Sequence, residues 1–178
     1  PQIGFVHRGL EKLTEKRDMH QFGYIAERIC GICAVGHSYG YASACERMLD
    51  IEVPGRAQYI RTILHELSRI HSHLLWLGLL ADAFGFEALF YRSWTLREQI
   101  LKIFESTCGG RVILSINEIG GLKHDIEDSE LAGIVQALDA MRPDYEALVH
   151  TFLDDASCGE RLHGVGVISK KDALDLSM

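Results

Sequence analysis

The sequence predicts a mainly α-helical protein with minor short strands, and three observations carry this prediction. Only three prolines occur among 178 residues, which permits long helices. Apolar residues recur at steps of three and four along residues 54–83 and 87–107, which is the spacing of one helix face. Strands are weakly indicated, because only residues 111–119 and 164–169 favour short extended segments.

Two shorter helices are expected in the first 50 residues. Residues from about 14 to 28 and residues 34–49 both have the composition of helices. The first segment ends beside a pair of cysteines, and the second begins directly after this pair.

The longest expected helix covers residues 54–83 and begins with Pro54, which suits a first helical turn. The helix over residues 87–107 should end at Gly109 and Gly110, because glycine commonly follows the last turn of a helix. The apolar face of the longest helix consists of Ile60, Ile63, Leu64, Leu67, Ile70, Leu74 and Leu77.

A further helix is expected over residues 129–141, with Asp128 as its N-cap. Pro143 should break this helix, because proline has no N–H to donate and collides with the preceding turn. Helical character resumes over residues 145–153, and residues 172–178 indicate the start of a last helix.

The composition excludes several classes of protein. Apolar residues make up 47% and charged residues 24%, as in ordinary globular proteins. The net charge of −7, without runs of Lys or Arg, argues against binding to nucleic acid. The most apolar stretch, residues 74–81, is too short to cross a bilayer. We expect residues 1–178 to form a single partial domain of a longer protein.

The pair Cys30 and Cys33 is the strongest candidate for a chemical site. A C-x-x-C spacing lets two thiolates converge on one metal ion, and Gly31 permits a tight turn between them. Because the following segment is helical, its dipole should lower the pKa of both thiols. His37, four residues after Cys33, is either a further ligand or a hydrogen-bond donor to sulfur.

Other uses of the cysteines stay open at this stage. The odd number of five cysteines favours reduced thiols in a cytosolic compartment. Redox chemistry of the thioredoxin type is disfavoured, because the residues before Cys30 read as a helix rather than a strand. A zinc-stabilised helical scaffold would use Cys30, Cys33 and His37 with Cys45. Cys45, Cys108 and Cys158 are isolated in the sequence and are expected to be small buried apolar residues.

Histidines on the longest helix form a second pattern. His65, Arg69 and His73 lie four residues apart beside Glu66, which we interpret as a buried or interfacial polar ladder rather than a metal site. His71 should face a different side of the helix from His73.

The segment from Arg28 to Cys33, followed by His37, resembles the first cysteine motif of nickel–iron hydrogenase large subunits. The resemblance extends over nearly the whole chain and is greatest to the energy-converting branch, that of formate hydrogenlyase and Ech-type enzymes. Further matching motifs are His7-Arg8-Gly9-Leu10-Glu11-Lys12, Val53-Pro54-Gly55-Arg56-Ala57-Gln58, Arg61-Thr62-Ile63-Leu64, Ser72-His73-Leu74-Leu75, Gly109-Gly110-Arg111, Ile119-Gly120-Gly121-Leu122 and Gly164-Val165-Gly166.

The resemblance implies the helical-bundle core of this fold and a membrane-associated enzyme that forms or cleaves dihydrogen heterolytically. Cys30 would be a terminal nickel ligand and Cys33 a bridge between nickel and iron. His37 would donate a hydrogen bond to the Cys33 sulfur, and Glu11 would relay protons. Arg28 would fix the motif through a salt bridge.

The resemblance also implies partners and a location. Electrons would leave through an iron–sulfur small subunit, with iron–sulfur clusters only in partner subunits, and membrane-arm subunits would hold the protein on the cytoplasmic face of the membrane. The family needs a second C-x-x-C, and the residues after Cys33 hold none. The fragment alone is therefore expected to be inactive, and to self-associate through surfaces that partners would cover.

One alternative enzyme has the same fold. The 49-kDa subunit of respiratory complex I, an NADH:quinone oxidoreductase, lacks the cysteine motif and belongs to a quinone-binding, NADH-dehydrogenase assembly. Cys30 and Cys33 therefore favour the hydrogenase over this alternative.

Overall fold

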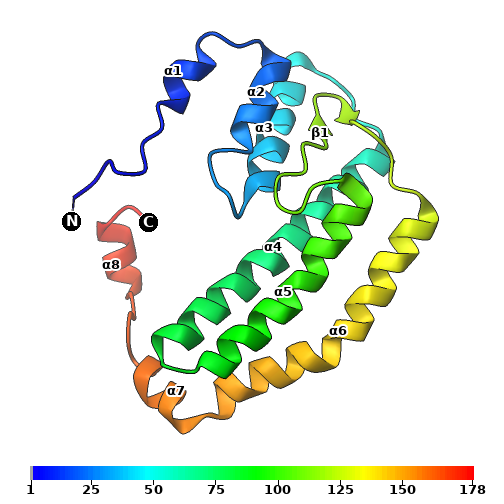
Figure 1. Cartoon of the computed structure of the whole chain (residues 1–178). Coiled ribbons are helices and arrows are strands. Elements are labelled where there is room, and N and C mark those ends of the chain that lie inside the picture. Colours follow the sequence, from blue (N-terminus) through cyan, green and yellow to red (C-terminus); the bar gives the residue numbers. More distant parts are fainter. Residues whose placement is uncertain (1) are drawn as a thin grey trace. The chain divides into compact units, whose positions relative to one another are not determined.

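The computed structural model describes residues 2–178 and confirms that the protein is mainly helical. Two compact units divide the chain, one ending at Met141 and the other beginning at Arg142. The elements are α1 (Leu10–Thr14), α2 (Met19–Ala26), α3 (Ala34–Leu49), α4 (Gly55–Ala83), α5 (Glu87–Cys108), β1 (Asn117–Glu118), β2 (Gly121–Leu122), α6 (Asp128–Asp154), α7 (Ala156–Leu162) and α8 (Lys170–Asp175) (Figure 1).

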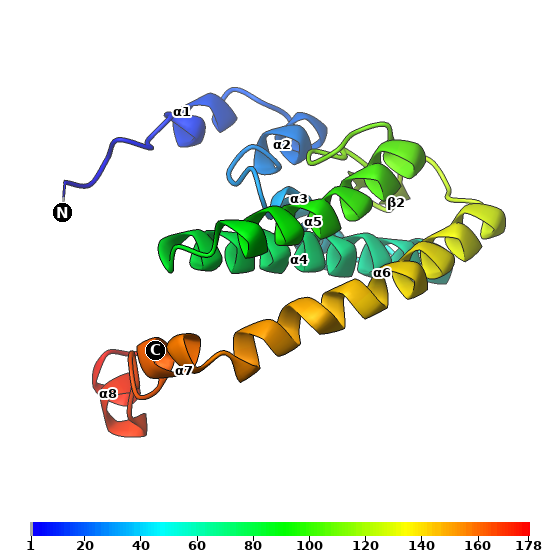
Figure 2. The same cartoon turned by 60° about the horizontal axis from the view of Figure 1, so that its bottom comes forward.

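A hairpin of the two long helices α4 and α5 forms the core of the first unit, and the two helices lie side by side in both views (Figures 1 and 2). Both helices match their predicted ranges to within one residue, and α5 ends at Gly109 in the left-handed conformation. Gly78 permits the close approach of the helices, since a Cβ atom there would lie 2.8 Å from the Trp94 ring. The buried apolar side chains of the hairpin include Ile60, Leu64, Leu67, Leu74, Leu96, Ile100 and Phe104.

Helices α2 and α3 pack at one end of this hairpin together with the small β-sheet (Figure 1). Strands β1 and β2 are antiparallel, with Asn117 opposite Leu122. The strand expected over residues 111–119 is shorter than predicted, because Leu114 and Ile116 are buried by packing rather than by strand pairing. Residues 164–169 form no strand, so that prediction is wrong.

A buried ion pair joins α3, α4 and the β-sheet. The Arg61 guanidinium donates to both oxygens of Glu46, at 3.0 and 2.7 Å, and also to the carbonyls of Glu118 and Gly121. The Gly120 N–H donates to Glu46 Oε1 at 2.8 Å. Although burial alone would raise the pKa of Glu46, the bonds from Arg61 and Gly120 lower it. This network holds the C-terminal end of α3 in place.

The helix expected over residues 14–28 is shorter than predicted and corresponds to α2, because α1 already ends at Thr14. Asp18 separates the two helices, because its backbone is extended and its carboxylate accepts a hydrogen bond from the Gln21 N–H at 2.8 Å. The residue is therefore a helix N-cap, which begins α2 at Met19.

Helix α6 differs from its prediction at the N-cap, Asp128, and at the break expected at Pro143. It begins at Asp128, which accepts a hydrogen bond from Arg56 at 3.0 Å instead of capping the helix. It also runs through Pro143 without a break. The missing N–H costs one helical bond, to the carbonyl of Asp139, and both residues are exposed, so water can replace that bond.

The second unit contains the end of α6 and two capped short helices. Asp155 caps α7 through the Cys158 N–H, and Ser169 caps α8 in a reciprocal arrangement with Asp172. Within residues 2–178, no helix combines the length and the apolar character that crossing a membrane requires.

Candidate metal centre

The two cysteines of the C-x-x-C motif lie in the loop between α2 and α3. Cys30 follows the last turn of α2, and Cys33 is the N-cap residue of α3. His37 lies one helical turn after Cys33, so its ring reaches back toward the loop. The two sulfur atoms and a ring nitrogen of His37 all lie within 4.8 Å of one another. The structure therefore brings the three candidate residues of the sequence analysis together.

Hydrogen bonds already surround the sulfur atoms. The N–H groups of Ile32 and Cys33 point at the Cys30 sulfur, at 3.4 and 3.3 Å. The Nε2 atom of His37 lies 3.4 Å from the Cys33 sulfur. Such donors stabilise the negative charge of a thiolate, which is the form that binds metals.

The two thiols share their protons unequally. The hydrogen bond from Cys33 and the nearby N–H groups lower the pKa of Cys30. Although Cys33 is an exposed residue, partial desolvation of its sulfur and the hydrogen bond to Cys30 raise the pKa of Cys33 to about 11. The prediction that the helix lowers the pKa of both thiols is wrong for Cys33, because desolvation of its sulfur, and then the neighbouring Cys30, disfavour its charged form.

Glu27, which the sequence analysis did not single out, is a buried residue three positions before Cys30 and links this segment to α3 and to Ser115. Glu27 is fully buried and accepts hydrogen bonds from the Ser38 hydroxyl and from the N–H and hydroxyl of Ser115. Asn117 donates to Ser38, while its own Oδ1 is buried beside a cavity of about 40 Å³ and has no hydrogen-bond partner among residues 2–178. Only the adjacency of Glu27 to the motif was visible in the sequence; its burial depends on the packing of β1 and α3.

The buried histidine of α4 is His71, not a member of the expected ladder. Its Nε2 atom lies 3.3 Å from the carbonyl oxygen of Ile32, and its Nδ1 atom accepts a hydrogen bond from Arg97 at 2.9 Å. Burial, and then the charge of Arg97, lower the pKa of His71 to about 4.

The expected polar ladder of α4 is not buried along its length, since only His65 of its three members is half-buried. Arg69 and His73 are exposed, and Arg69 forms a surface ion pair with Glu66 at 2.6 Å. As predicted, His71 and His73 face different sides of the helix.

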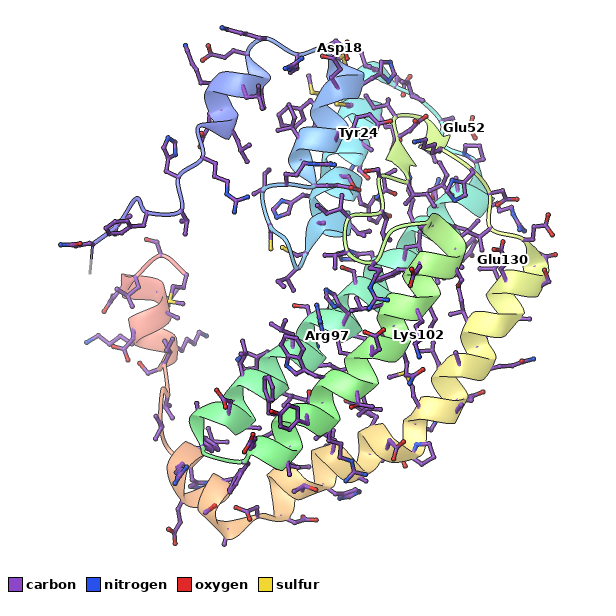
Figure 3. The ribbon with its side chains drawn as sticks, viewed as in Figure 1. Asp18, Tyr24, Glu52, Arg97, Lys102 and Glu130 are labelled. Atoms are coloured by element: carbon purple, nitrogen blue, oxygen red, sulfur yellow. The ribbon has the colours of Figure 1, made fainter. Side chains whose placement is uncertain are left out.

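Two further predicted site residues lie outside the ligand group. Glu11 is exposed on α1 and is not a member of the group of Cys30, Cys33 and His37. Arg28 is exposed, and its Nη1 donates to the carbonyl of Tyr24 at 2.5 Å, in place of the expected salt bridge. Tyr24 is labelled on α2 in Figure 3.

The three isolated cysteines do not extend the ligand group. Cys45 and Cys158 are buried, as predicted, and Cys108 is half-buried. In the part of the chain that the structure describes, Cys45 does not join Cys30, Cys33 and His37, so the four ligands of the zinc alternative are not assembled.

Comparison with known proteins identifies both halves of the chain. Residues 8–82 match the sequence model of the nickel-dependent hydrogenases, and residues 83–178 match that of the 49-kDa subunit of the respiratory-chain NADH dehydrogenase. The first match contains all five predicted site residues, Glu11, Arg28, Cys30, Cys33 and His37. The chain belongs to the nickel–iron hydrogenase large-subunit and complex I 49-kDa family.

Relatives within this family are oxidoreductase subunits of two kinds. The membrane-bound hydrogenase subunit alpha of Pyrococcus furiosus is 37% identical over 98% of this chain and 41% of that protein. Formate hydrogenlyase subunit 5 of Escherichia coli is 37% identical over 99% of this chain and 31% of that protein. An NADH-quinone oxidoreductase subunit of Thermodesulfovibrio yellowstonii is 37% identical over the whole chain and 44% of that protein.

A solved structure has the same fold. A chain of the membrane-bound sulfane sulfur reductase, an archaeal respiratory membrane complex, superposes with a TM-score of 0.91 at 30% identity, over 97% of this chain and 46% of that one. The chain thus spans less than half the length of these relatives, which are subunits of multi-subunit assemblies.

The donor atoms present fit one half of a nickel–iron ligand set. Two sulfur atoms converge, and N–H groups already point at one of them. Soft thiolate ligands suit such a centre better than they suit a hard oxygen-seeking cation. The remaining thiolates would have to come from outside residues 1–178, since no second C-x-x-C occurs here.

Proposed function

We propose that this chain is the part of a catalytic large subunit of a membrane-associated, energy-converting nickel–iron hydrogenase that supplies the first pair of cysteine ligands. The observation that carries the proposal is the convergence of Cys30, Cys33 and His37 in the region that matches the nickel-dependent hydrogenases. Nearly the whole of this chain is similar to part of a membrane-bound hydrogenase subunit and to part of a formate hydrogenlyase subunit, which supports the same assignment.

Each residue of the centre has a distinct task in this proposal. Cys30 and Cys33 would hold the nickel–iron centre, Cys30 as a terminal thiolate and Cys33 as the thiolate shared by the two metals. The Cys30 sulfur, toward which two N–H groups point, is held ready as a thiolate. His37 donates to the Cys33 sulfur and so adjusts its electron density. The bound centre supplies the heterolytic formation or cleavage of dihydrogen.

Protons and electrons require groups beyond the ligands. Glu11 exchanges protons with the terminal thiolate, and its exposed position on α1 permits contact with water or with a partner subunit. Arg28 holds the last turn of α2 through the Tyr24 carbonyl and thereby supports the loop. Electrons pass to an iron–sulfur subunit, and membrane-arm subunits hold the protein at the cytoplasmic face.

A second candidate is a quinone-reducing subunit of the complex I type. Residues 83–178 match the 49-kDa subunit, and NADH-quinone oxidoreductase relatives align with the chain at similar identity. The cysteine pair favours the hydrogenase, because quinone reduction by this fold does not need two converging thiols.

Metal analysis of the full-length protein in its native complex tests the proposal. We expect nickel in the purified complex and dihydrogen-dependent reduction of a dye. Cys30→Ser and Cys33→Ser should each lose the nickel, whereas Cys45→Ser on the neighbouring helix α3 should retain it. Glu11→Gln should retain nickel and lose most of the activity, by about 10²-fold or more. A complex without nickel that reduces quinone would replace the hydrogenase with the second candidate.

A further inference from the structure

The loop that carries both cysteines has few packing contacts of its own. Gly31 and Cys33 are exposed, and a Cβ atom at Gly31 would meet nothing within 4 Å. A hydrogen bond from a neighbouring element therefore adds to the few contacts that position the loop. It comes from α4, where the buried His71 ring reaches the carbonyl of Ile32, the residue directly before Cys33.

Arg97 determines which hydrogen bond His71 makes. A guanidinium can only donate, so the 2.9 Å bond from Arg97 Nε makes His71 Nδ1 an acceptor. A neutral ring with an acceptor at Nδ1 carries its proton on Nε2, which then donates to the Ile32 carbonyl at 3.3 Å.

Arg97 is itself held in place. Its guanidinium lies over the Trp94 ring, with its carbon 5.0 Å from the ring centroid. Figure 3 labels Arg97 on α5, beside α4. The contacts thus run from α5 through a ring on α4 to the cysteine loop.

We propose that His71, oriented by Arg97, is a positioning residue that fixes the backbone of the Cys30–Cys33 loop and so sets the separation of the two sulfur atoms. The inference rests on the proposed function only in that the sulfur atoms are taken to bind a metal. Any buried histidine needs hydrogen-bond partners for its two nitrogens. For His71 these partners are the Ile32 carbonyl in the loop and the Arg97 guanidinium, which permits a single tautomer. Partners that orient ligands in this way affect metal affinity although they never touch the metal.

The test uses full-length protein freed of metal, with Co²⁺ as the probe and the thiolate-to-cobalt absorption band as the readout. His71→Leu removes the donor to Ile32, and we expect Co²⁺ binding to weaken by about 10- to 100-fold. His71→Gln keeps an N–H near the position of Nε2 and should restore most of the affinity. His73→Leu, two residues along the same helix but exposed, should bind Co²⁺ like the unmodified protein.

A second readout needs no metal. The ratio of the alkylation rates of Cys30 and Cys33, measured by mass spectrometry, should change by about fivefold in His71→Leu, the effect of one ordinary hydrogen bond, and should return with Gln. Equal cobalt affinity and equal alkylation ratios in folded His71→Leu and unmodified protein would overturn the inference.

Nitrogen NMR of histidine-labelled, unmodified protein decides the question even where His71→Leu does not fold. We expect the Nε2-protonated tautomer of His71, and a proton on Nδ1 would overturn the inference. Native protein without nickel would remove the proposed function but leave the alkylation and tautomer results to decide this inference separately.

Discussion

The two ends of helix α3 use buried charge in opposite ways. At the C-terminal end, Glu46 is matched by the Arg61 guanidinium, so the charges balance and the pair also bonds to the β-sheet. At the N-terminal end, Glu27 is buried and accepts hydrogen bonds from the neutral groups of Ser38 and Ser115. The first end has its polar groups committed to the fold.

The difference shows where the molecule can do chemistry. Buried polar groups that are all paired rigidify a structure, whereas groups left with spare capacity indicate a site. At the N-terminal end, the buried Oδ1 of Asn117 has no hydrogen-bond partner among the described residues, and the thiols of Cys30 and Cys33, which are not fully buried, converge within reach of one metal ion. Changes at the two ends should therefore separate stability from metal binding.

The largest effect on stability is expected from Arg61→Met. This change leaves Glu46 buried without its partner and should lower the free energy of unfolding by about 3 to 5 kcal/mol. Urea unfolding of the full-length protein measures this loss. Arg69→Met on the same helix breaks only an exposed pair and should cost less than about 1 kcal/mol. Similar losses in the two variants would contradict a structural role for the C-terminal end.

Acid should loosen the N-terminal end before the C-terminal end. Folding lowers the pKa of His71 from 6.5 to about 4, so between these values the unfolded chain binds more protons. The contribution of neutral His71 to the free energy of unfolding is complete above pH 6.5. It falls as the pH is lowered toward 4, by about 3 kcal/mol at most. Folding lowers the pKa of Glu46, so its contribution to the free energy of unfolding is complete above 4.5, its ordinary pKa, and is lost only at lower pH.

Unfolding free energies measured from pH 8 to 4 test this order. The difference between the unmodified protein and His71→Gln should narrow as the pH falls below about 6.5, the ordinary pKa of histidine. A difference that stays constant over this range would show that His71 does not titrate on unfolding.

A smaller effect is expected from Glu27→Gln. The new amide either turns its NH2 group toward the Ser115 N–H, so that two donors face each other, or leaves another partner of Glu27 unbonded. Either arrangement should lower the free energy of unfolding by about 2 kcal/mol. Metal retention should fall as well, because the loop before Cys30 loses its support. Glu118→Gln, exposed in the neighbouring strand, is the matched control and should change stability by less than about 0.5 kcal/mol. If Glu27→Gln keeps its full nickel content, Glu27 stabilises the fold and has no role in metal binding.

The smallest effect on stability is expected from Cys33→Ser. Its side chain is exposed, so the free energy of unfolding of metal-free protein should change by less than about 0.5 kcal/mol, although metal binding is lost. Cys45→Ser places a hydroxyl in the buried face of α3 and should show the reverse, a stability loss of about 1 to 3 kcal/mol with metal retained. Thermal unfolding and metal analysis of both variants provide the comparison.

The two long helices α4 and α5 and the spacing of the ligands could be predicted from the sequence, because both are local. Periodic apolar residues define α4 and α5, and a C-x-x-C motif followed by His37 brings three ligand atoms together within eight residues. Continuation of α6 through Pro143 was missed, because an exposed helix tolerates one lost hydrogen bond.

The burial of the polar side chains and their contacts could not be predicted, because both depend on how the helices pack. His71 and His73 are equally polar and two residues apart, yet the packing of α5 buries one and leaves the other in water. Glu27 meets Ser115, and Arg97 meets His71, across long stretches of sequence. Burial and hydrogen-bond partners depend on distant elements, so neither spacing nor composition can supply them.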